Sequence, residues 1–169
     1  MGEFAELTEN QKSYIQMGTA WAVIERARNL ELAKIGLNIP EAQLLYYLKV
    51  SKEPLTPMKL ARMTYKQPHT VSALVQRMET RGLVSTNRDL KRKNWVRVSL
   101  TRKGEEAMKR WATATEVPDD VFCLSKREAT ALHMITKKLH QRSLGMLRKM
   151  QPDPYSEPSL FQQESTVKA

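Results

Sequence analysis

The sequence has little of what several protein classes require. It contains a single cysteine, Cys123, among 169 residues, so no disulfide can form within the chain. No apolar run approaches the roughly 20 residues that are needed to span a bilayer. The first ten residues carry three glutamates and no lysine or arginine, which is not the pattern of a secretory signal. We therefore expect a cytoplasmic protein without a membrane segment.

Signatures of enzymes and metal sites are scarce too. The sequence has no glycine-rich phosphate loop and no nucleophile elbow. Two of its three histidines, His133 and His140, lie two helical turns apart, with no acidic residue or cysteine three or four positions away. We therefore expect no catalytic residue, no metal and no cofactor. Cys123 lies in an apolar stretch, and we interpret it as a buried, unreactive thiol.

Positive charge is abundant and unevenly distributed. The chain carries a net charge of +10, from 28 basic and 18 acidic residues. Fourteen of the basic residues but only four of the acidic ones lie between Lys59 and Arg110, so this segment holds the whole excess. A localised positive field is typical of polyanion binding, although a solvated basic surface has the same composition.

Apolar periodicity and capping residues predict six helices and one β-hairpin. The stretch 117–124, which contains Pro118, is expected to be a loop, and the proline-containing tail after Met150 is expected to be mobile. The predicted helices cover about 8–35, 39–50, 57–63, 68–81, 102–114 and 125–150, and the predicted strands cover 83–87 and 95–100.

The predicted helix over residues 68–81 has two different faces. One face is an apolar stripe that suits packing against the preceding short helix, and it consists of Val71, Leu74, Val75 and Met78. The other face carries short or polar side chains that fit a major groove, where glutamine pairs with adenine and arginine with guanine. A solvated amphipathic helix shows the same pattern. The candidate DNA-reading residues are His69, Thr70, Ser72, Ala73, Gln76 and Arg77.

The predicted hairpin follows directly and has a basic tip. Four of the six residues 88–93 are lysine or arginine. Such a tip can follow phosphates or insert an arginine into a narrow minor groove, and the alternative is a solvated turn. A recognition-type helix, a basic hairpin and localised charge together favour DNA binding. The candidate wing residues are Arg88, Lys91, Arg92 and Lys93, with Arg92 favoured at the tip.

In this order the segments resemble the MarR-type transcriptional regulators. The resemblance rests on Leu55-Thr56 with Leu60-Ala61, on residues 70–84 (TVSALVQRMETRGLV) and on residues 96–104 (VRVSLTRKG). It covers about residues 8–150. The family wing often has an acidic residue followed by two arginines, whereas here Asp89 is followed by Leu-Lys-Arg-Lys-Asn, so the register of the wing stays open.

The resemblance implies a mainly α fold with a small β-hairpin, a winged helix-turn-helix with N- and C-terminal dimerisation helices. The winged helix would cover 37–100, the dimerisation region 8–36 and 101–150, and a tail 151–169. The resemblance also implies a homodimer that reads an inverted repeat in double-stranded DNA, commonly as a repressor. A small ligand, or oxidation in some members, would release it. Peroxide-sensing members use a cysteine in the first helix, and this chain has none there.

Two further hypotheses stay open. A ligand pocket between the dimerisation helices and the winged helix would have as walls Met17, Trp21, Tyr46, Tyr47 and Met63, although such side chains also suit an ordinary core. The alternative function is a winged helix that binds a protein or RNA through its basic face and reads no operator. Binding to a duplex at increasing salt concentration separates the two functions.

Overall fold

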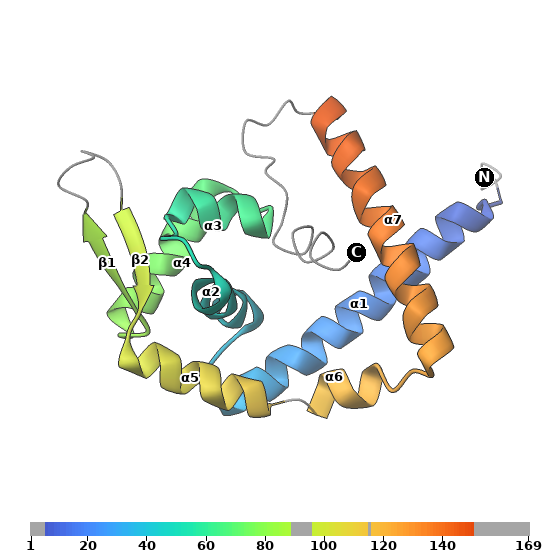
Figure 1. The fold of residues 1–169 in the computed structure, drawn as a ribbon. Helices are drawn as coiled ribbons and strands as arrows, with labels where there is room; N and C mark the ends of the chain where they lie inside the picture. Colours follow the sequence, from blue (N-terminus) through green and yellow to red (C-terminus); the bar gives the residue numbers. More distant parts are fainter. Residues whose placement is uncertain (1–5, 89–95, 115, 151–169) are drawn as a thin grey trace, which may run out of the picture.

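The computed structural model describes residues 6–88, 96–114 and 116–150. As predicted, the fold is mainly α with one antiparallel hairpin (Figure 1). The helices are α1 (Glu9–Lys34), α2 (Ile39–Val50), α3 (Pro57–Thr64), α4 (Pro68–Thr80), α5 (Arg102–Thr113), α6 (Glu116–Val121) and α7 (Lys126–Met150). The strands are β1 (Val84–Arg88) and β2 (Val96–Leu100).

Capping side chains fix the starts of α1, α2 and α3. Thr8 and Gln11 form a reciprocal capping box at the start of α1, and Asn38 and Glu41 form another at α2. Thr56 caps α3 by accepting a hydrogen bond from the N–H of Lys59 at 3.1 Å. Each cap satisfies N–H groups that have no partner inside the helix, which fixes where the helix starts.

The core lies between α2, α3, α4 and the hairpin, and these elements form one lobe (Figure 1). The whole apolar stripe of α4 is buried, as the sequence predicts. Leu32 of α1 and Ala107 of α5 are also buried in this core, so the lobe draws on residues outside the predicted range 37–100. Its fully buried large side chains are Leu32, Leu44, Leu45, Leu60, Met78 and Val71.

The hairpin is locked onto the lobe through its second strand. β1 and β2 pair antiparallel, from Val84 opposite Leu100 to Arg88 opposite Val96. The N–H of Val98 donates to the carbonyl of Leu55 at 2.8 Å, which ties β2 to the segment before α3. Side chains alternate between the two faces of a strand. Because Val98 points into the core, its neighbours Arg97 and Ser99 face solvent.

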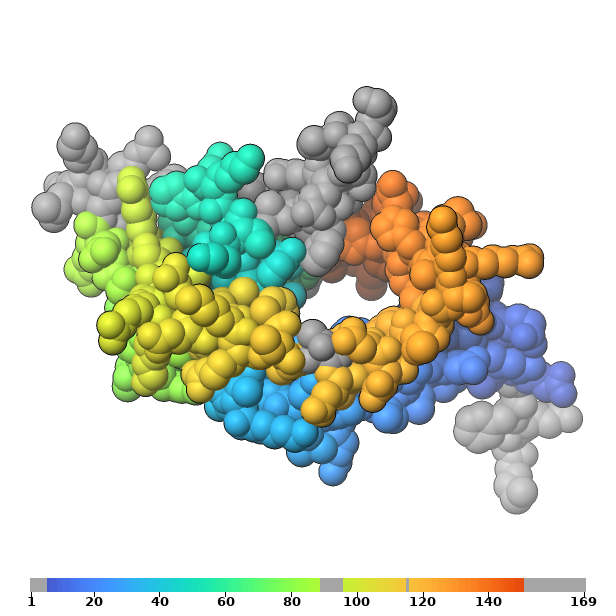
Figure 2. All heavy atoms as spheres, turned by 60° about the horizontal axis from the view of Figure 1, so that its bottom comes forward, coloured from blue at the N-terminus to red at the C-terminus, as the bar shows by residue number. Residues whose placement is uncertain are grey.

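Most of α1 and of α7 lies outside the core of the lobe. The N-terminal half of α1 is exposed, and the single buried residue of α7 is Leu144 among the 25 residues of that helix. Figure 2 shows α6 beside α1, between α5 and α7. Ser125 and Glu128 hydrogen-bond reciprocally at the start of α7.

Two sequence-based predictions are wrong. The stretch 117–124 is not wholly a loop, because Glu116–Val121 form the short helix α6. Pro118 lies in the first turn of this helix, where a missing N–H costs no internal hydrogen bond. Cys123 is exposed and not buried, because it lies in the link between α6 and α7 on the surface of the chain. The predicted hairpin tip and the tail 151–169 lie outside the described residues.

One close approach fixes the start of α5 against the hairpin. A Cβ atom at Gly104 would lie 2.1 Å from the carbonyl oxygen of Leu83, which is backbone and cannot rotate away. The neighbouring cap residue Thr101 donates its hydroxyl hydrogen bond to the carbonyl of Gly82 at 2.6 Å. A residue with a side chain at position 104 therefore forces α5 away from the end of α4.

We expect Gly104→Ala to lower the free energy of unfolding by about 1–3 kcal/mol, the usual cost of overpacking. Thermal and urea unfolding measure the change. Glu106→Ala is the matched control, because Glu106 is an exposed residue of the same helix and its ion pair with Arg102 is long, at 3.6 Å. Equal stabilities for the two variants would contradict the close approach.

Candidate nucleic-acid interface

The helix pair α3 and α4 forms a helix-turn-helix. α3 ends at Tyr65, which adopts the left-handed conformation with φ of 54°, and the N–H of Lys66 donates to the carbonyl of Ala61 at 3.1 Å. α4 then begins at Pro68, whose fixed φ suits a first helical position. The tight turn lets α4 pack across α3 with its apolar stripe inward, which leaves the opposite face of α4 outside.

The structure gathers the predicted recognition residues on that outer face. Ser72 is half-buried, and the other five are exposed: His69, Thr70, Ala73, Gln76 and Arg77. They follow one another at helical spacing, so they form one continuous strip without a bulky apolar side chain. The arrangement offers hydrogen-bond donors and acceptors to the edges of bases, and the reading of bases by these residues stays a prediction.

The hairpin stands beside this strip. Arg88 is exposed at the end of β1, whereas Lys91, Arg92 and Lys93 lie outside the described residues. Arg97, which is absent from the predicted wing residues, is exposed on β2 opposite Asn87 and adds a basic side chain to this side of the hairpin. The alternation of polar and apolar residues in β2 was the signal that could have identified it.

Glu79 ties the hairpin to the end of α4. Its carboxylate accepts hydrogen bonds from the hydroxyl of Thr86 at 2.6 Å and from the N–H of Thr86 at 2.8 Å. These bonds favour the ionised form and lower the pKa of Glu79 below its ordinary value. The tie sets the direction of β1 relative to the recognition strip.

Arg81 ties the other side of α4 to the corner between α1 and α2. Its guanidinium donates to the carboxylate of Glu41 and to the carbonyl of Gly36. Glu41 is buried although it is charged, and its second oxygen accepts the N–H of Asn38 at 3.2 Å. Sequence reasoning assigned no role to either side chain of this ion pair, because their contact spans forty residues.

The predicted pocket residues fall into two sets. Tyr46, Tyr47 and Met63 belong to the lobe, where the Tyr47 hydroxyl donates to the carbonyl of Met63 at 3.4 Å. Burial raises the pKa of Tyr47. Met17 and Trp21 lie on α1 and expose 50% and 57% of their surface. A pocket that uses both sets stays a prediction.

The turn of the helix-turn-helix also contacts α7. The Tyr65 hydroxyl lies 3.4 Å from Nε2 of His140, and the two rings meet edge to face with centroids 5.7 Å apart.

Within the described parts of the chain, no group of three histidine, cysteine, aspartate or glutamate residues could hold a metal. No helix among these residues is long and apolar enough to cross a membrane.

Comparison with known proteins gives a consistent result. Residues 35–93 match the sequence model of the MarR family. The organic hydroperoxide resistance transcriptional regulator of Bacillus subtilis (strain 168) is 25% identical over 142 residues, which are 80% of this chain and 93% of the relative.

Solved structures match over most of the chain. The organohalide-sensing transcriptional regulator RdhR-CbdbA1625, in its ligand-free form, has a TM-score of 0.81 and 26% identity, covering 94% of this chain and 92% of that one. Its form with bound 2,4-dichlorophenol has a TM-score of 0.79 and 28% identity, covering 88% and 89%. Sco3205, a MarR family regulator from Streptomyces coelicolor in complex with DNA, shares the fold, with a TM-score of 0.74 and 20% identity over 83% and 92%.

The fold and the exposed strip define a winged helix-turn-helix protein, in which α4 is the recognition helix and the hairpin is the wing. Residues 35–93 thus match the MarR family, and nearly the whole chain is similar to transcriptional regulators of known structure. The family is one of regulators and not of enzymes.

We expect Glu79→Ala to free the base of the wing and to speed amide hydrogen exchange at Thr86 by about tenfold or more, since the amide loses its acceptor. Exchange measured by NMR tests this, with Glu106→Ala as the control.

The same tie has a predicted pH dependence. Because its folded-state pKa is lowered, the Glu79 tie is complete above the ordinary carboxyl pKa and is lost as the pH falls through the lowered value. Thr86→Val, which removes the hydroxyl donor, should move the Glu79 pKa back upward in an NMR titration. An unchanged Glu79 pKa in this variant would rule out the tie.

Proposed function

We propose that the protein is a homodimeric, sequence-specific repressor that acts in the cytoplasm and reads an inverted-repeat operator in double-stranded DNA. The observation that carries the proposal is the outer strip of α4, a row of short or polar side chains that is held rigid by the buried stripe beneath it. The Sco3205 complex supports it, because a protein of the same fold was solved with DNA.

The two parts of the interface have different tasks. Lysine and arginine of the wing neutralise phosphates and release counterions, which gives affinity that falls with salt. Side chains of the α4 strip, with Gln76 and Arg77 as its longest hydrogen-bonding members, contact the edges of bases in the major groove and give sequence preference. The localised charge of +10 between Lys59 and Arg110 supports this division, since it surrounds both parts.

Dimerisation covers the apolar faces that a single chain leaves bare. α7 spans 25 residues with one buried side chain, which is unusual for a helix that has no partner. A second copy that packs on α1 and α7 buries this surface through a two-fold axis. The large apolar residues exposed on these helices are Tyr14, Ile15, Met17, Trp21, Val23, Leu30, Met134, Ile135, Leu139, Met146, Leu147 and Met150.

The two-fold axis sets the distance between the recognition helices. Both strips dock at once when they lie about 34–36 Å apart, one turn of DNA. A ligand that changes this distance lowers affinity, because the second lobe then docks at a strained position. The RdhR-CbdbA1625 structure with 2,4-dichlorophenol supports a small organic effector, which we place between the lobe and α1 near Trp21 and Tyr46.

Duplex titration tests the function. The purified protein should sediment as a dimer and bind an inverted repeat recovered by selection from random duplexes, with affinity that falls steeply as salt rises. Tight binding to RNA or to an acidic protein, with no preferred duplex, would favour the interaction module instead. A monomer that ignores all duplexes at low salt would refute the proposal.

Two variants separate base reading from phosphate contact. Gln76→Ala should cost about 1–3 kcal/mol on the selected duplex and little on random duplexes, because it removes a contact to a base. Arg92→Ala should weaken binding to both equally and reduce the salt slope by about 1. Equal losses for Gln76→Ala on all sequences would contradict its role in reading bases.

A further inference from the structure

Two covalent connections join the lobe to the helices that extend from it. At the first, α1 enters the lobe, where Leu32 is buried in the core. At the second, the chain leaves α5, whose Ala107 is in the same core, and continues into α6 and α7. α6 packs along α1, so the two connections lie side by side (Figure 1). Whatever fixes one connection to the other also fixes α6 relative to the lobe, and α7 follows α6 through the link 122–125, with the contact between Tyr65 and His140 as a second point of attachment to the lobe.

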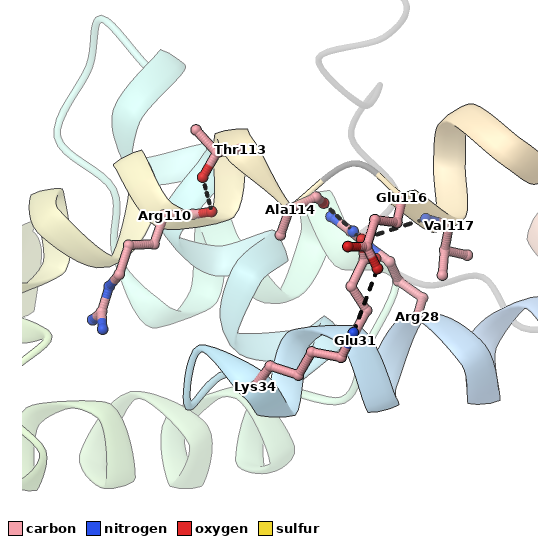
Figure 3. A network of polar contacts seen from close by, with 8 residues as sticks. All are labelled: Arg28, Glu31, Lys34, Arg110, Thr113, Ala114, Glu116 and Val117. Atoms are coloured by element: carbon pink, nitrogen blue, oxygen red, sulfur yellow. Dashed lines mark hydrogen bonds and ion pairs between the residues drawn. The ribbon is translucent and has the colours of Figure 1, made fainter.

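Arg28 and Glu31 lie at this junction (Figure 3). Nη1 of Arg28 donates both to the Glu31 carboxylate and to the carbonyl of Ala114, the residue that caps the end of α5. The other oxygen of Glu31 accepts the N–H of Val117, in the first turn of α6, at 3.3 Å. Two adjacent side chains of α1 therefore hold the last carbonyl of one helix and an early N–H of the next.

Glu31 is buried and Arg28 is largely covered, which sets this pair apart from the exposed ion pairs of α1. The side chains of Arg28 and Glu31 are 14% and 5% exposed, whereas Lys34 and Glu116, which join the same two helices at 3.4 Å, are 69% and 76% exposed. Each buried charge needs both its ionic partner and its backbone contact to offset the loss of hydration. Any other orientation of α6 on α1 breaks these contacts and leaves a charge without compensation.

We propose that Arg28 and Glu31 form a junction clamp that sets the orientation of the winged lobe relative to α7, and thereby the spacing of the two recognition helices in the dimer. They are positioning residues for operator binding, which they influence without lying on the DNA-reading strip. The effect on the spacing of the recognition helices rests on the proposed function. The effect on the orientation of the lobe does not.

The direct test measures orientation without DNA. Spin labels at Lys52→Cys on the lobe and Lys138→Cys on α7, both exposed positions, are introduced with Cys123→Ser. The labelled protein is mixed with an excess of unlabelled protein, so that pulsed electron paramagnetic resonance reports distances between the two labels of one chain. Arg28→Met combined with Glu31→Gln removes both charges together, which avoids a lone buried charge and keeps the lobe folded. We expect a narrow distance distribution for the parent and a clearly broader one for this double variant.

The matched control is Lys34→Met combined with Glu116→Gln, which removes the exposed pair between the same helices. It should keep the narrow distribution. Circular dichroism of each variant confirms that the helices are intact. A folded clamp variant with the parental distribution would overturn the proposal, as would a control that broadens just as much.

The second test measures operator spacing. The selected inverted repeat is resynthesised with one to five base pairs added or removed between its halves. The parent should prefer one spacing, and the clamp variant should lose about tenfold in affinity at that spacing and bind the series more evenly, because avidity depends on matched geometry. An unchanged spacing profile would overturn the link from clamp to operator. If the parent binds no duplex, the proposed function fails, while the spin-label distances still decide whether the clamp exists.

Discussion

Burial of one side of α4 is the constraint on which the rest of the structure depends. Val71, Leu74, Val75 and Met78 are at most 2% exposed, and burial of such side chains contributes about 1.5–3 kcal/mol each. With this side fixed inward, the rotation of α4 about its axis is determined, and so is the set of side chains that solvent meets. The composition of the exposed face of α4 is therefore a consequence of core packing and not of any interaction among the surface residues themselves.

Charged side chains at the margin of the core then set directions that apolar packing leaves free. Hydrophobic contacts are non-directional, so they hold elements together without fixing their angles precisely. Glu41 with Arg81, and Glu79 with Thr86, fix both flanks of α4 through hydrogen bonds of defined geometry. Arg28 with Glu31 does the same where the chain leaves the lobe. Apolar contacts thus hold the elements together, and polar contacts fix the angles between them.

Much of the fold could be predicted from the sequence because its signals are local. Capping residues such as Thr8 and Asn38 mark helix starts within a few positions, and the stripe of α4 repeats at the helical period. The short helix α6 was missed because six residues are too few to show a period. The exposure of Cys123 was misjudged because apolar neighbours in sequence do not guarantee cover in space.

The site was predictable only in part, for a related reason. The outer face of α4 follows from periodicity, so its residues could be named in advance. The buried carboxylates of Glu31 and Glu41 could not, because their partners lie elsewhere in the chain and a glutamate in a helix usually faces solvent. The predicted pocket would include the exposed side chains of α1. If a second copy packs there, a single chain does not contain all the walls of that pocket.

The tight approach at Gly104 bears on how variation in this protein should be interpreted. The backbone of Leu83 occupies the space where a side chain would stand, so only hydrogen fits there. If the proposed operator binding were used to score a mutational survey, replacements at this position would lower the score through instability, and it would resemble a residue that touches DNA. Its intolerance would instead report steric exclusion between α5 and the base of the wing, and separating the two readings requires a stability measurement on each inactive variant.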